Sequence, residues 1–342
     1  MTVAVQHPVV LDRLANVSAA RGAEGLGHRL AALERWVRAD LADFEAELAV
    51  LPRGARLVQA AAHHLLDLRG KHLRPTCVAL ASRFGAGFTP RVRGLAVAVE
   101  LVHTATLLHD DVVDLAERRR GEAAACVVYG NAASIFAGDW LLVAALRRIA
   151  ASGVDGLLDR MLAVIDEMIL AESLQLERRG RVVADRDEYF RIVEGKTASL
   201  FRWAMLAGAR AAELPELAEH ALDRFGLHLG VAFQAIDDEL DFRAGTGKDP
   251  LVDLREGKMT YPLVVAIERD PTLAARIEAA LAGESELDAI ASAVRATGAL
   301  TATRMLAEDH ASRALEALAL LPAGAARDAL ETVVLASLER TS

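Results

Sequence analysis

Residues 90–116 have the sequence PRVRGLAVAVELVHTATLLHDDVVDLA and are apolar along most of their length. Pro90 begins the segment, and proline is favoured in the first helical turn because its missing N–H is not needed there. Apolar residues fall on nearly every face of the predicted helix, which indicates a central, buried helix. Its end carries three carboxylates, Asp110, Asp111 and Asp114, and three arginines follow at 118–120.

The rest of the chain continues the helical pattern. Apolar residues make up 53% of the chain, led by Ala and Leu, which are strong helix formers, and they recur at spacings of three and four. Val and Ile form no alternating runs, so few strands are expected. Further helices are expected at residues 29–48, 55–68, 131–150, 154–178, 186–209 and 214–242, with shorter ones after a polar loop at 245–260.

The chain has 342 residues, a length that suits one large domain or two ordinary ones. It shows no Pro/Ser-rich linker, no low-complexity segment and no clear internal repeat. We therefore predict one all-α domain at residues 29–342, a single large bundle of ten or more helices. Residues 1–28 are predicted to form a weakly structured N-terminal extension.

Composition also excludes several classes of protein. The net charge of −9 argues against a nucleic-acid-binding surface. The N-terminus lacks the basic start and apolar core of a signal peptide, and no segment approaches the roughly 18–20 apolar residues of a membrane span. Cys77 and Cys126 are not at zinc-binding spacing, so two reduced thiols in a cytoplasmic protein are expected.

The first acidic cluster needs compensation that its own helix does not supply. Positions four apart share one helix face, so Asp110 and Asp114 point the same way, with Asp111 beside them. Like charges at this spacing repel, and the preceding turn, residues 105–108, holds no basic residue. Hard divalent cations prefer carboxylate oxygens, so the cluster predicts a metal site. Taken alone, this short motif also fits a solvated acidic face.

A second cluster has the same spacing. FQAIDDELDF at residues 233–242 places Asp237, Asp238 and Asp241 at the end of another long apolar helix. If the two helices face each other, six carboxylates converge on one cavity. Mg²⁺ usually takes one or two carboxylates and completes its shell with water and phosphate oxygens. The pair of clusters therefore predicts Mg²⁺ and a polyphosphate ligand.

Basic residues suited to phosphate binding occur along the chain, several of them beside glycine, where the backbone can approach a phosphate. Arg offers phosphate two parallel N–H groups, and Lys offers a point charge. Each of these residues alone is as readily a surface charge, so the prediction depends on the set. The set is Lys71, Arg74, Arg119, Arg120, Lys196, Lys248 and Lys258.

Together these motifs resemble the trans-polyprenyl diphosphate synthases, the head-to-tail isoprenyl diphosphate synthases, over about residues 60–320. They occur in the family's order and are most similar to its bacterial medium- and long-chain branch. The motifs are GKHLRP, HTATLLHDDVVD, RRG, GNAASIFAGDWLL, ESLQL, GKTASLF, FQAIDDELD and GKDPLVDLREGKMTYPL. The resemblance implies the isoprenoid synthase fold around a deep central cavity, and a homodimer.

The resemblance also implies a role for each site residue. Mg²⁺, three ions with substrate bound, would join the allylic diphosphate to Asp110, Asp114 and Asp237. The metal shell would be supported by Asp111, Asp238 and Asp241. The allylic diphosphate would contact Arg119, Lys196 and Lys258, with Lys248 nearby, and the reacting centre would be lined by Thr197 and Gln234. Isopentenyl diphosphate would be held by Lys71, Arg74, His103 and Arg120.

Two of the polar residues keep a second interpretation. A lone histidine on an apolar helix is often a core residue, although His103 lies two turns before Asp110 on nearly the same face. Gln175 in ESLQL is either a pocket-facing group or a surface residue in the middle of a helix.

The implied reaction agrees with elementary chemistry. The allylic primer is dimethylallyl, geranyl or farnesyl diphosphate, and breaking its C–O bond leaves a diphosphate anion and a delocalised carbocation. Mg²⁺ and cationic side chains stabilise the departing charge. The double bond of isopentenyl diphosphate attacks the cation, and a proton is then lost, with the released diphosphate as the expected acceptor. No nucleophilic side chain is needed.

Small residues before the first cluster predict a product of C20 or longer. In the family, bulky aromatics four or five residues before the first Asp close the tail pocket and give short products. Here those positions are Ala105 and Thr106, which also suit close helix packing. The pocket wall is predicted to comprise Leu101, Val102, Ala105 and Thr106, with Val143 and Leu146 as candidates for its floor.

Other functions stay open at this point. A short-chain farnesyl diphosphate synthase shares the motifs, whereas a class I terpene cyclase normally has a different second metal motif and lacks the GKxxRP site. A regulatory subunit of a heteromeric synthase tends to lose carboxylates, and a helical scaffold would use the charges structurally. Departures from the family pattern concern loop geometry: Leu115, Ala116, Glu122 and Leu251, the last where Gly is usual.

Overall fold

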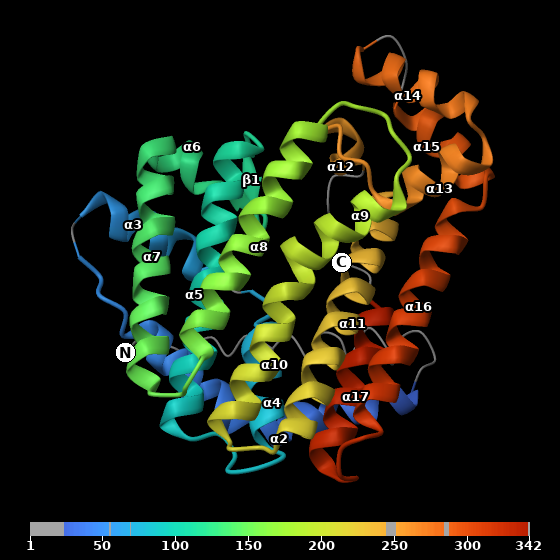
Figure 1. Ribbon diagram of the computed structural model, residues 1–342. Helices are drawn as coiled ribbons and strands as arrows, with labels where there is room; N and C mark the ends of the chain where they lie inside the picture. Colours follow the sequence, from blue (N-terminus) through green and yellow to red (C-terminus); the bar gives the residue numbers. More distant parts are fainter. Residues whose placement is uncertain (1–23, 55, 69, 244–250, 284–286, 341–342) are drawn as a thin grey trace. The chain divides into compact units, whose positions relative to one another are not determined.

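The computed structural model describes residues 24–54, 56–68, 70–243, 251–283 and 287–340. These residues are almost entirely helical (Figure 1), which confirms the predicted all-α class with more than ten helices. Within them, the one β-pair consists of β1 (Arg118–Arg119) and β2 (Glu122–Ala123). The predicted boundary near residue 29 stays a prediction, although the first described helix already begins at Glu24.

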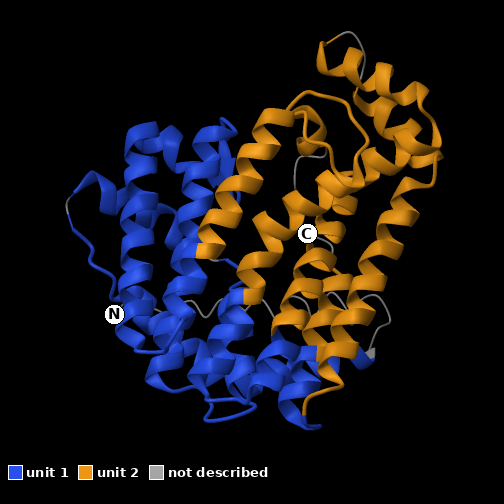
Figure 2. Ribbon diagram, viewed as in Figure 1, with its two compact units in different colours: residues 1–162, 203–222, 322–330 blue, residues 163–202, 223–321, 331–342 orange. Residues whose placement is uncertain are grey.

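The chain divides into two compact units (Figure 2). Unit 1 comprises residues 1–162, 203–222 and 322–330, and unit 2 comprises residues 163–202, 223–321 and 331–342. The first aspartate cluster belongs to unit 1, and the second belongs to unit 2.

The helices that begin in unit 1 are α2 (Glu24–Ala49), α3 (Leu57–Leu66), α4 (Leu73–Ser82), α5 (Pro90–Val113), α6 (Ala125–Tyr129), α7 (Asn131–Ser152), α8 (Leu157–Arg178), α11 (Glu216–Asp241) and α17 (Ala325–Leu338). Those that begin in unit 2 are α9 (Arg186–Val193), the π-helical turn η1 (Glu194–Ala198), α10 (Ser199–Ala211), α12 (Val252–Arg255), α13 (Tyr261–Arg269), α14 (Thr272–Leu281), α15 (Leu287–Ala296) and α16 (Ala299–Leu318).

Helix α5 lies in the core of unit 1, as its sequence predicts. Residues 95–102 are all buried, and α7 packs along the helix. Gly138 of α7 makes this approach possible, because a Cβ there would lie 2.3 Å from Nε2 of His109. The hydroxyl of Ser134 donates to the carbonyl oxygen of Leu108 at 2.8 Å. The close packing of α7 therefore fixes the part of α5 that leads into the first cluster.

Helix α5 ends earlier than the predicted helix at residues 90–116. Its last residue is Val113, and Asp114 forms its C-cap. Leu115 has a φ of 54°, and the N–H of Ala116 donates to the carbonyl oxygen of Asp111 at 2.9 Å. This is the hydrogen bond of a Schellman cap, whose left-handed position usually holds glycine. Because Leu occupies it, the residue pattern gave no signal that the helix ends there.

The helix predicted at residues 186–209 is confirmed, but its middle is a π-helical turn that the sequence did not indicate. Helix α9 ends at Val193, the π-helical turn η1 follows, and α10 begins at Ser199. Gly195 lets η1 lie against α8, because a Cβ there would be 2.8 Å from the carbonyl oxygen of Glu167. Single π turns recur at functional sites, and this one carries Lys196 and Thr197.

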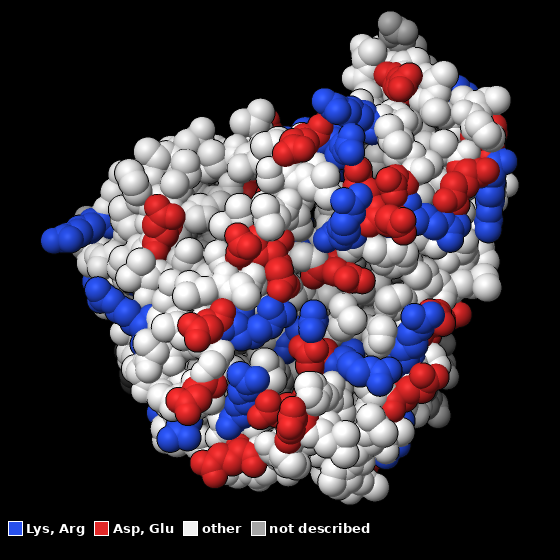
Figure 3. Space-filling model, in the orientation of Figure 1, with Lys and Arg blue, Asp and Glu red and all other residues white. Residues whose placement is uncertain are grey.

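The surface carries charges of both signs. On the face in Figure 3, Lys and Arg side chains lie interspersed with Asp and Glu. Among the described residues, no helix has both the length and the apolar character needed to cross a membrane.

Gly230 of α11 tests the close packing of η1. An added Cβ would lie 2.5 Å from the Cα of Ala198, so we expect Gly230→Ala to lower the free energy of unfolding by about 1–3 kcal/mol. Gly94→Ala in α5 is the matched control, because nothing lies within 4 Å of an added Cβ there. We expect that variant to gain about 0.5–1 kcal/mol from helix propensity. Urea denaturation measures both effects, and equal changes would contradict the packing argument.

Candidate functional site

The first cluster separates one buried carboxylate from two accessible ones. Asp111 is fully buried, while Asp110 and Asp114 are half-buried. Asp114 lies one turn beyond Asp110, and its N–H donates to the Asp110 carbonyl oxygen at 2.8 Å. Burial raises the pKa of Asp111, and Arg119 opposes the shift through a hydrogen bond of 2.7 Å from its Nε to Oδ1. Arg119, predicted to bind the allylic diphosphate, thus pairs with Asp111 in this structure.

A hairpin that the sequence did not reveal positions the two predicted arginines. Arg119 pairs with Glu122 across the strands, leaving Arg120 and Gly121 as a two-residue turn. Both have positive φ, 52° and 87°, as in the type I′ turn that matches strand twist. Nη1 of Arg120 donates to the carbonyl oxygen of Leu68 at 2.5 Å.

Several of the predicted diphosphate-binding residues of unit 1 gather around a carboxylate that sequence reasoning did not assign. Glu100 is only 3% exposed, and its Oε1 lies 3.2 Å from Nδ1 of His72. Burial alone would raise the pKa of Glu100, but His72, His103 and Arg120 together lower it to about 2. A glutamate inside an apolar run was the available signal, because buried carboxylates almost always have a partner.

The basic residues around Glu100 are themselves perturbed by burial. Burial lowers the pKa of Arg74 to about 10, and Glu100 opposes the shift. Burial also lowers the pKa of Arg120, and the charge of Glu100 again opposes the shift. Burial lowers the pKa of His103 to about 3, and the charge of Arg74 adds to this effect. Lys71, just before α4, is exposed. These groups form a partly buried, cationic region with a neutral imidazole.

In the second cluster, Asp238 is the buried carboxylate. Its Oδ2 accepts hydrogen bonds from the hydroxyl of Tyr189 at 2.8 Å and from the N–H of Tyr261 at 3.3 Å. Its Oδ1 accepts one from Gln234 at 2.9 Å, and Gln234 accepts one from the hydroxyl of Thr197 at 2.9 Å. Burial raises the pKa of Asp238 to about 7, although these hydrogen bonds act to lower it. A continuous network therefore joins η1 to the second cluster.

The other two aspartates of the second cluster have different partners. Oδ1 of Asp237 accepts a hydrogen bond of 2.6 Å from Arg340. Oδ1 of Asp241 accepts one of 2.9 Å from the N–H of Val252. Leu251 has a φ of 59° and is buried, so the loop holds a strained leucine where the family usually has glycine. The carboxylate of Asp241 thus caps the start of α12.

The described lysines of unit 2, Lys196 and Lys258, lie among acidic groups. Lys196 pairs with Glu172 and donates to Gln175 at 3.0 Å, which places Gln175 beside a predicted site residue. Lys258 lies 2.6 Å from Glu256. Burial and the nearby Asp241 and Asp238 raise the pKa of Asp253 to about 8, an acidic neighbour that the sequence reasoning missed. Lys248 lies outside the described residues.

The predicted pocket wall is largely buried on α5. Leu101, Val102 and Ala105 are buried, and Thr106 is half-buried with its hydroxyl bonded to the carbonyl oxygen of His103 at 2.8 Å. The suggested floor at Val143 is not supported, because that side chain is 48% exposed.

The donor set fits a divalent cation that arrives with a second ligand. Within the described ranges, no group of three or more His, Cys, Asp or Glu side chains is arranged to hold a metal ion alone. Mg²⁺ needs only one or two carboxylates when phosphate and water complete its shell. Oδ2 of Asp111 is buried without a hydrogen-bond partner. Burial, together with the charges of Asp241 and Asp238, raises the pKa of Asp253. A nearby cation would stabilise the charged form of these carboxylates.

Comparisons with known proteins agree with this chemistry. The family model described as Polyprenyl synthetase matches residues 55–297. The chain is 36% identical to the octaprenyl diphosphate synthase of Escherichia coli (strain K12), over 80% of this chain and 87% of that protein. It is 35% identical to the geranyl-diphosphate-specific all-trans-nonaprenyl-diphosphate synthase of Rhodobacter capsulatus, over 83% and 89%. The structure resembles a Caulobacter crescentus CB15 polyprenyl synthase complexed with calcium and isoprenyl diphosphate (TM-score 0.85, 36% identity, 91% and 97% covered).

His103 allows a test of the buried cationic region. Below its ordinary pKa of 6.5 the unfolded chain takes up a proton at His103, whereas the folded chain does not until a pH of about 3. We therefore expect this residue to lower the free energy of unfolding by about 1–2 kcal/mol between pH 7 and pH 5.

Urea denaturation at the two pH values should show a smaller loss for His103→Gln than for the wild type. His220→Gln controls for the substitution itself, because its side chain is 72% exposed. Identical pH dependence in the wild type and His103→Gln would contradict the burial argument.

Proposed function

This chain belongs to the polyprenyl synthetase family, and we propose that it is a long-chain, all-trans polyprenyl diphosphate synthase. It is a transferase of prenyl groups that joins isopentenyl diphosphate head to tail to an allylic diphosphate primer. The observation that carries the proposal is the family match over residues 55–297 together with two intact aspartate clusters, each at the end of a long helix.

The family depends on a divalent cation, and we propose Mg²⁺, three ions with substrate bound. The half-buried carboxylates Asp110, Asp114 and Asp237 would bind it, because Asp111 and Asp238 are buried and the family resemblance assigns Asp241 to the supporting shell. When bound, the cation supplies positive charge that stabilises the departing diphosphate. The chain adds Lys196, Lys258 and Arg119, whose charges neutralise the same anion.

We place isopentenyl diphosphate in the cationic region of unit 1. Arg74 and Arg120 supply guanidinium groups for its diphosphate, and exposed Lys71 supplies a further charge. Glu100 contributes by compensating these cations, because a buried group of positive charges without a carboxylate would be costly. With its pKa at about 3, His103 is neutral near pH 7 and so acts there as a hydrogen-bonding group.

The reaction needs ionisation, attack and proton loss, and the residues present fit each step. The allylic C–O bond breaks as the cationic side chains hold the diphosphate. The double bond of isopentenyl diphosphate attacks the allylic cation, and the released diphosphate takes the proton that is lost. The apolar residues of α5, including Leu101 and Val102, would exclude water that would otherwise quench the cation.

Similar proteins and a small residue on α5 support a long product, and one similar protein supports an allylic primer such as geranyl diphosphate. The similar proteins named above make octaprenyl and nonaprenyl diphosphates, and one of them is described as specific for geranyl diphosphate. In this chain the position five residues before Asp110 is the buried Ala105, so no bulky side chain stands at that position to stop the tail. A short-chain product is therefore not favoured.

A homodimer is part of the proposal. On α7 of unit 1, Ile135, Phe136 and Val143 are 40–59% exposed, and on the α8 segment in unit 2, Ile169 and Leu170 are 61% and 62% exposed. We take these exposed apolar side chains as part of a protein–protein contact. A second copy of the chain is the partner that we propose.

Product analysis tests the reaction directly. With labelled isopentenyl diphosphate, geranyl or farnesyl diphosphate and Mg²⁺, we expect a ladder of elongated products and none after chelation. Asp110→Asn and Asp237→Asn should each lower kcat/KM by about 10²–10³-fold, the usual scale for losing a group that stabilises transition-state charge. Asp166→Asn, at an exposed position of α8, should retain wild-type activity. Absence of any elongation by the wild type would reject the synthase proposal.

Ala105→Phe tests the tail pocket. A phenyl ring five residues before Asp110 should block the tail, so we expect shorter products with turnover of the first condensations retained. Ala105→Ser is the matched control and should keep the wild-type ladder, since its size barely changes. Mass analysis of the products shows whether the tail is blocked. The Tm of each variant shows any loss of stability from overpacking, which we expect to be about 1–3 kcal/mol. If the folded Ala105→Phe protein makes the same ladder of products as the wild type, the assignment of the tail pocket is wrong.

A further inference from the structure

The last described residue brings a positive charge to the second cluster. Arg340 lies two residues beyond α17, and its side chain is only 4% exposed. Its Nη2 donates to Oδ1 of Asp237 at 2.6 Å. Its guanidinium carbon lies 3.8 Å from the centre of the Phe233 ring. The guanidinium is therefore held between an aromatic face and a carboxylate, two features that each attract a cation.

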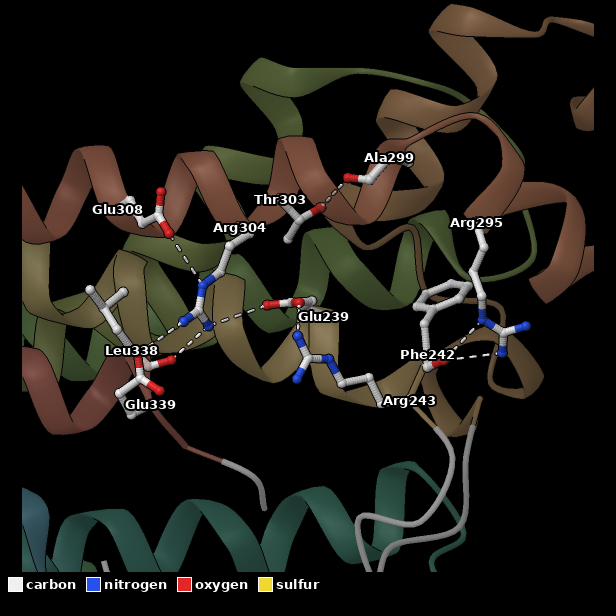
Figure 4. Close-up of polar contacts among 10 residues, drawn as sticks. All are labelled: Glu239, Phe242, Arg243, Arg295, Ala299, Thr303, Arg304, Glu308, Leu338 and Glu339. Carbon is white, nitrogen blue, oxygen red and sulfur yellow. Dashed lines mark hydrogen bonds and ion pairs between the residues drawn. The ribbon is translucent and has the colours of Figure 1, made fainter. Parts of the chain in front are cut away.

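The end of α17 is held in place by a second arginine, shown in Figure 4. Arg304 of α16 donates to the carbonyl oxygen of Leu338 at 2.6 Å. The same guanidinium lies 3.6 Å from the carboxylates of both Glu239 and Glu339. Because Glu239 stands two residues after Asp237 on α11, this bridge fixes the chain end beside the second cluster. The backbone at the end of α17 is thus fixed by contacts that do not involve the Arg340 side chain.

Apart from its hydrogen bond to Asp237, the guanidinium of Arg340 has nitrogen atoms that lack an acceptor. Its Nε and Nη1 are buried without a hydrogen-bond acceptor, and burial lowers its pKa while Asp237 opposes the shift. A buried cation is tolerated only when it is paired, so Asp237 is the group that keeps this arginine in place. Conversely, the arginine neutralises a carboxylate that the proposed function assigns to a metal ion.

We propose that Arg340 is the built-in counterion of Asp237 and competes with the divalent cation for that carboxylate. The inference rests on the proposed function, because it takes Asp237 as a metal ligand. A guanidinium bonded to Oδ1 occupies one coordinating atom and repels a cation that approaches the other. Cation binding therefore requires the guanidinium to leave Asp237, which couples metal loading to the position of the C-terminal residues.

A titration of the full-length protein with Mn²⁺ alone tests this competition. Electron paramagnetic resonance measures the concentration of free Mn²⁺ at each step. Arg340→Met removes the charge but keeps an apolar side chain beside Phe233. We expect it to bind Mn²⁺ about tenfold more tightly, the scale of removing one nearby like charge. Arg340→Lys keeps the charge and should stay within about threefold of the wild type.

Arg243→Met is the matched control for general electrostatics. Arg243 lies two residues after the end of α11 but pairs with Glu239, so its loss should change Mn²⁺ affinity by less than about twofold. A chain that ends at Glu339 is a second way to remove Arg340 and should behave like Arg340→Met. On the same samples, the Mn²⁺-induced rise in Tm should be larger for both than for the wild type.

The outcomes separate this inference from the proposed function. If Arg340→Met binds Mn²⁺ as weakly as the wild type or more weakly, competition is refuted while Asp237 can still be a ligand. If Arg243→Met raises the affinity as much as Arg340→Met does, the effect is not specific to Asp237 and the inference also fails. If Asp237→Asn binds Mn²⁺ as well as the wild type does, Asp237 is not a ligand, and the metal assignment of the proposed function fails first.

Discussion

Repulsion between neighbouring carboxylates at a helix end is the constraint on which both clusters depend. Neither α5 nor α11 supplies a lysine or arginine in the turn before its aspartates, so a permanent positive charge comes from elsewhere in the chain. In unit 1 it is Arg119, eight residues after Asp111 and folded back by a hairpin. In unit 2 it is Arg340, 103 residues after Asp237. Each guanidinium lets a dense group of acids persist beside an apolar core.

The arginine pairs with a buried aspartate in the first cluster and with a more exposed aspartate in the second. Arg119 pairs with the buried Asp111 and leaves the half-buried Asp110 and Asp114 at the helix end. In unit 2 the buried Asp238 is instead held by neutral donors, Tyr189 and Gln234, and the arginine pairs with the more exposed Asp237. Asp111 and Asp238 are buried, whereas Asp241 is half-buried, so burial alone does not separate supporting from metal-binding aspartates. That division itself came from the family resemblance.

Non-glycine residues with positive φ lie next to both clusters. Leu115 ends α5 after the first cluster, Arg120 turns the hairpin, and Leu251 follows the loop after the second cluster. Left-handed conformations cost a side-chain-bearing residue roughly 1 kcal/mol or more. They persist because neighbouring contacts hold them: the N–H of Ala116 bonds to Asp111, Arg120 bonds to Leu68, and the N–H of Leu251 bonds to Asp241. At Leu115 and Arg120 the residue pattern gives no sign of this conformation, whereas Leu251 stands where the family usually has glycine.

The sequence by itself determined the helical class, the buried character of α5 and the two aspartate clusters, because each depends on residues close together in the chain. The phosphate-binding lysines and arginines were also predicted from local motifs, and their roles stay a prediction. Only the tertiary structure showed Glu100 among the cations, the π turn that presents Lys196, and the pairing of Asp237 with Arg340. Those features depend on contacts between residues as much as 103 positions apart. Helical periodicity carries no information about such contacts, since it records which face is apolar and not which distant side chain meets it.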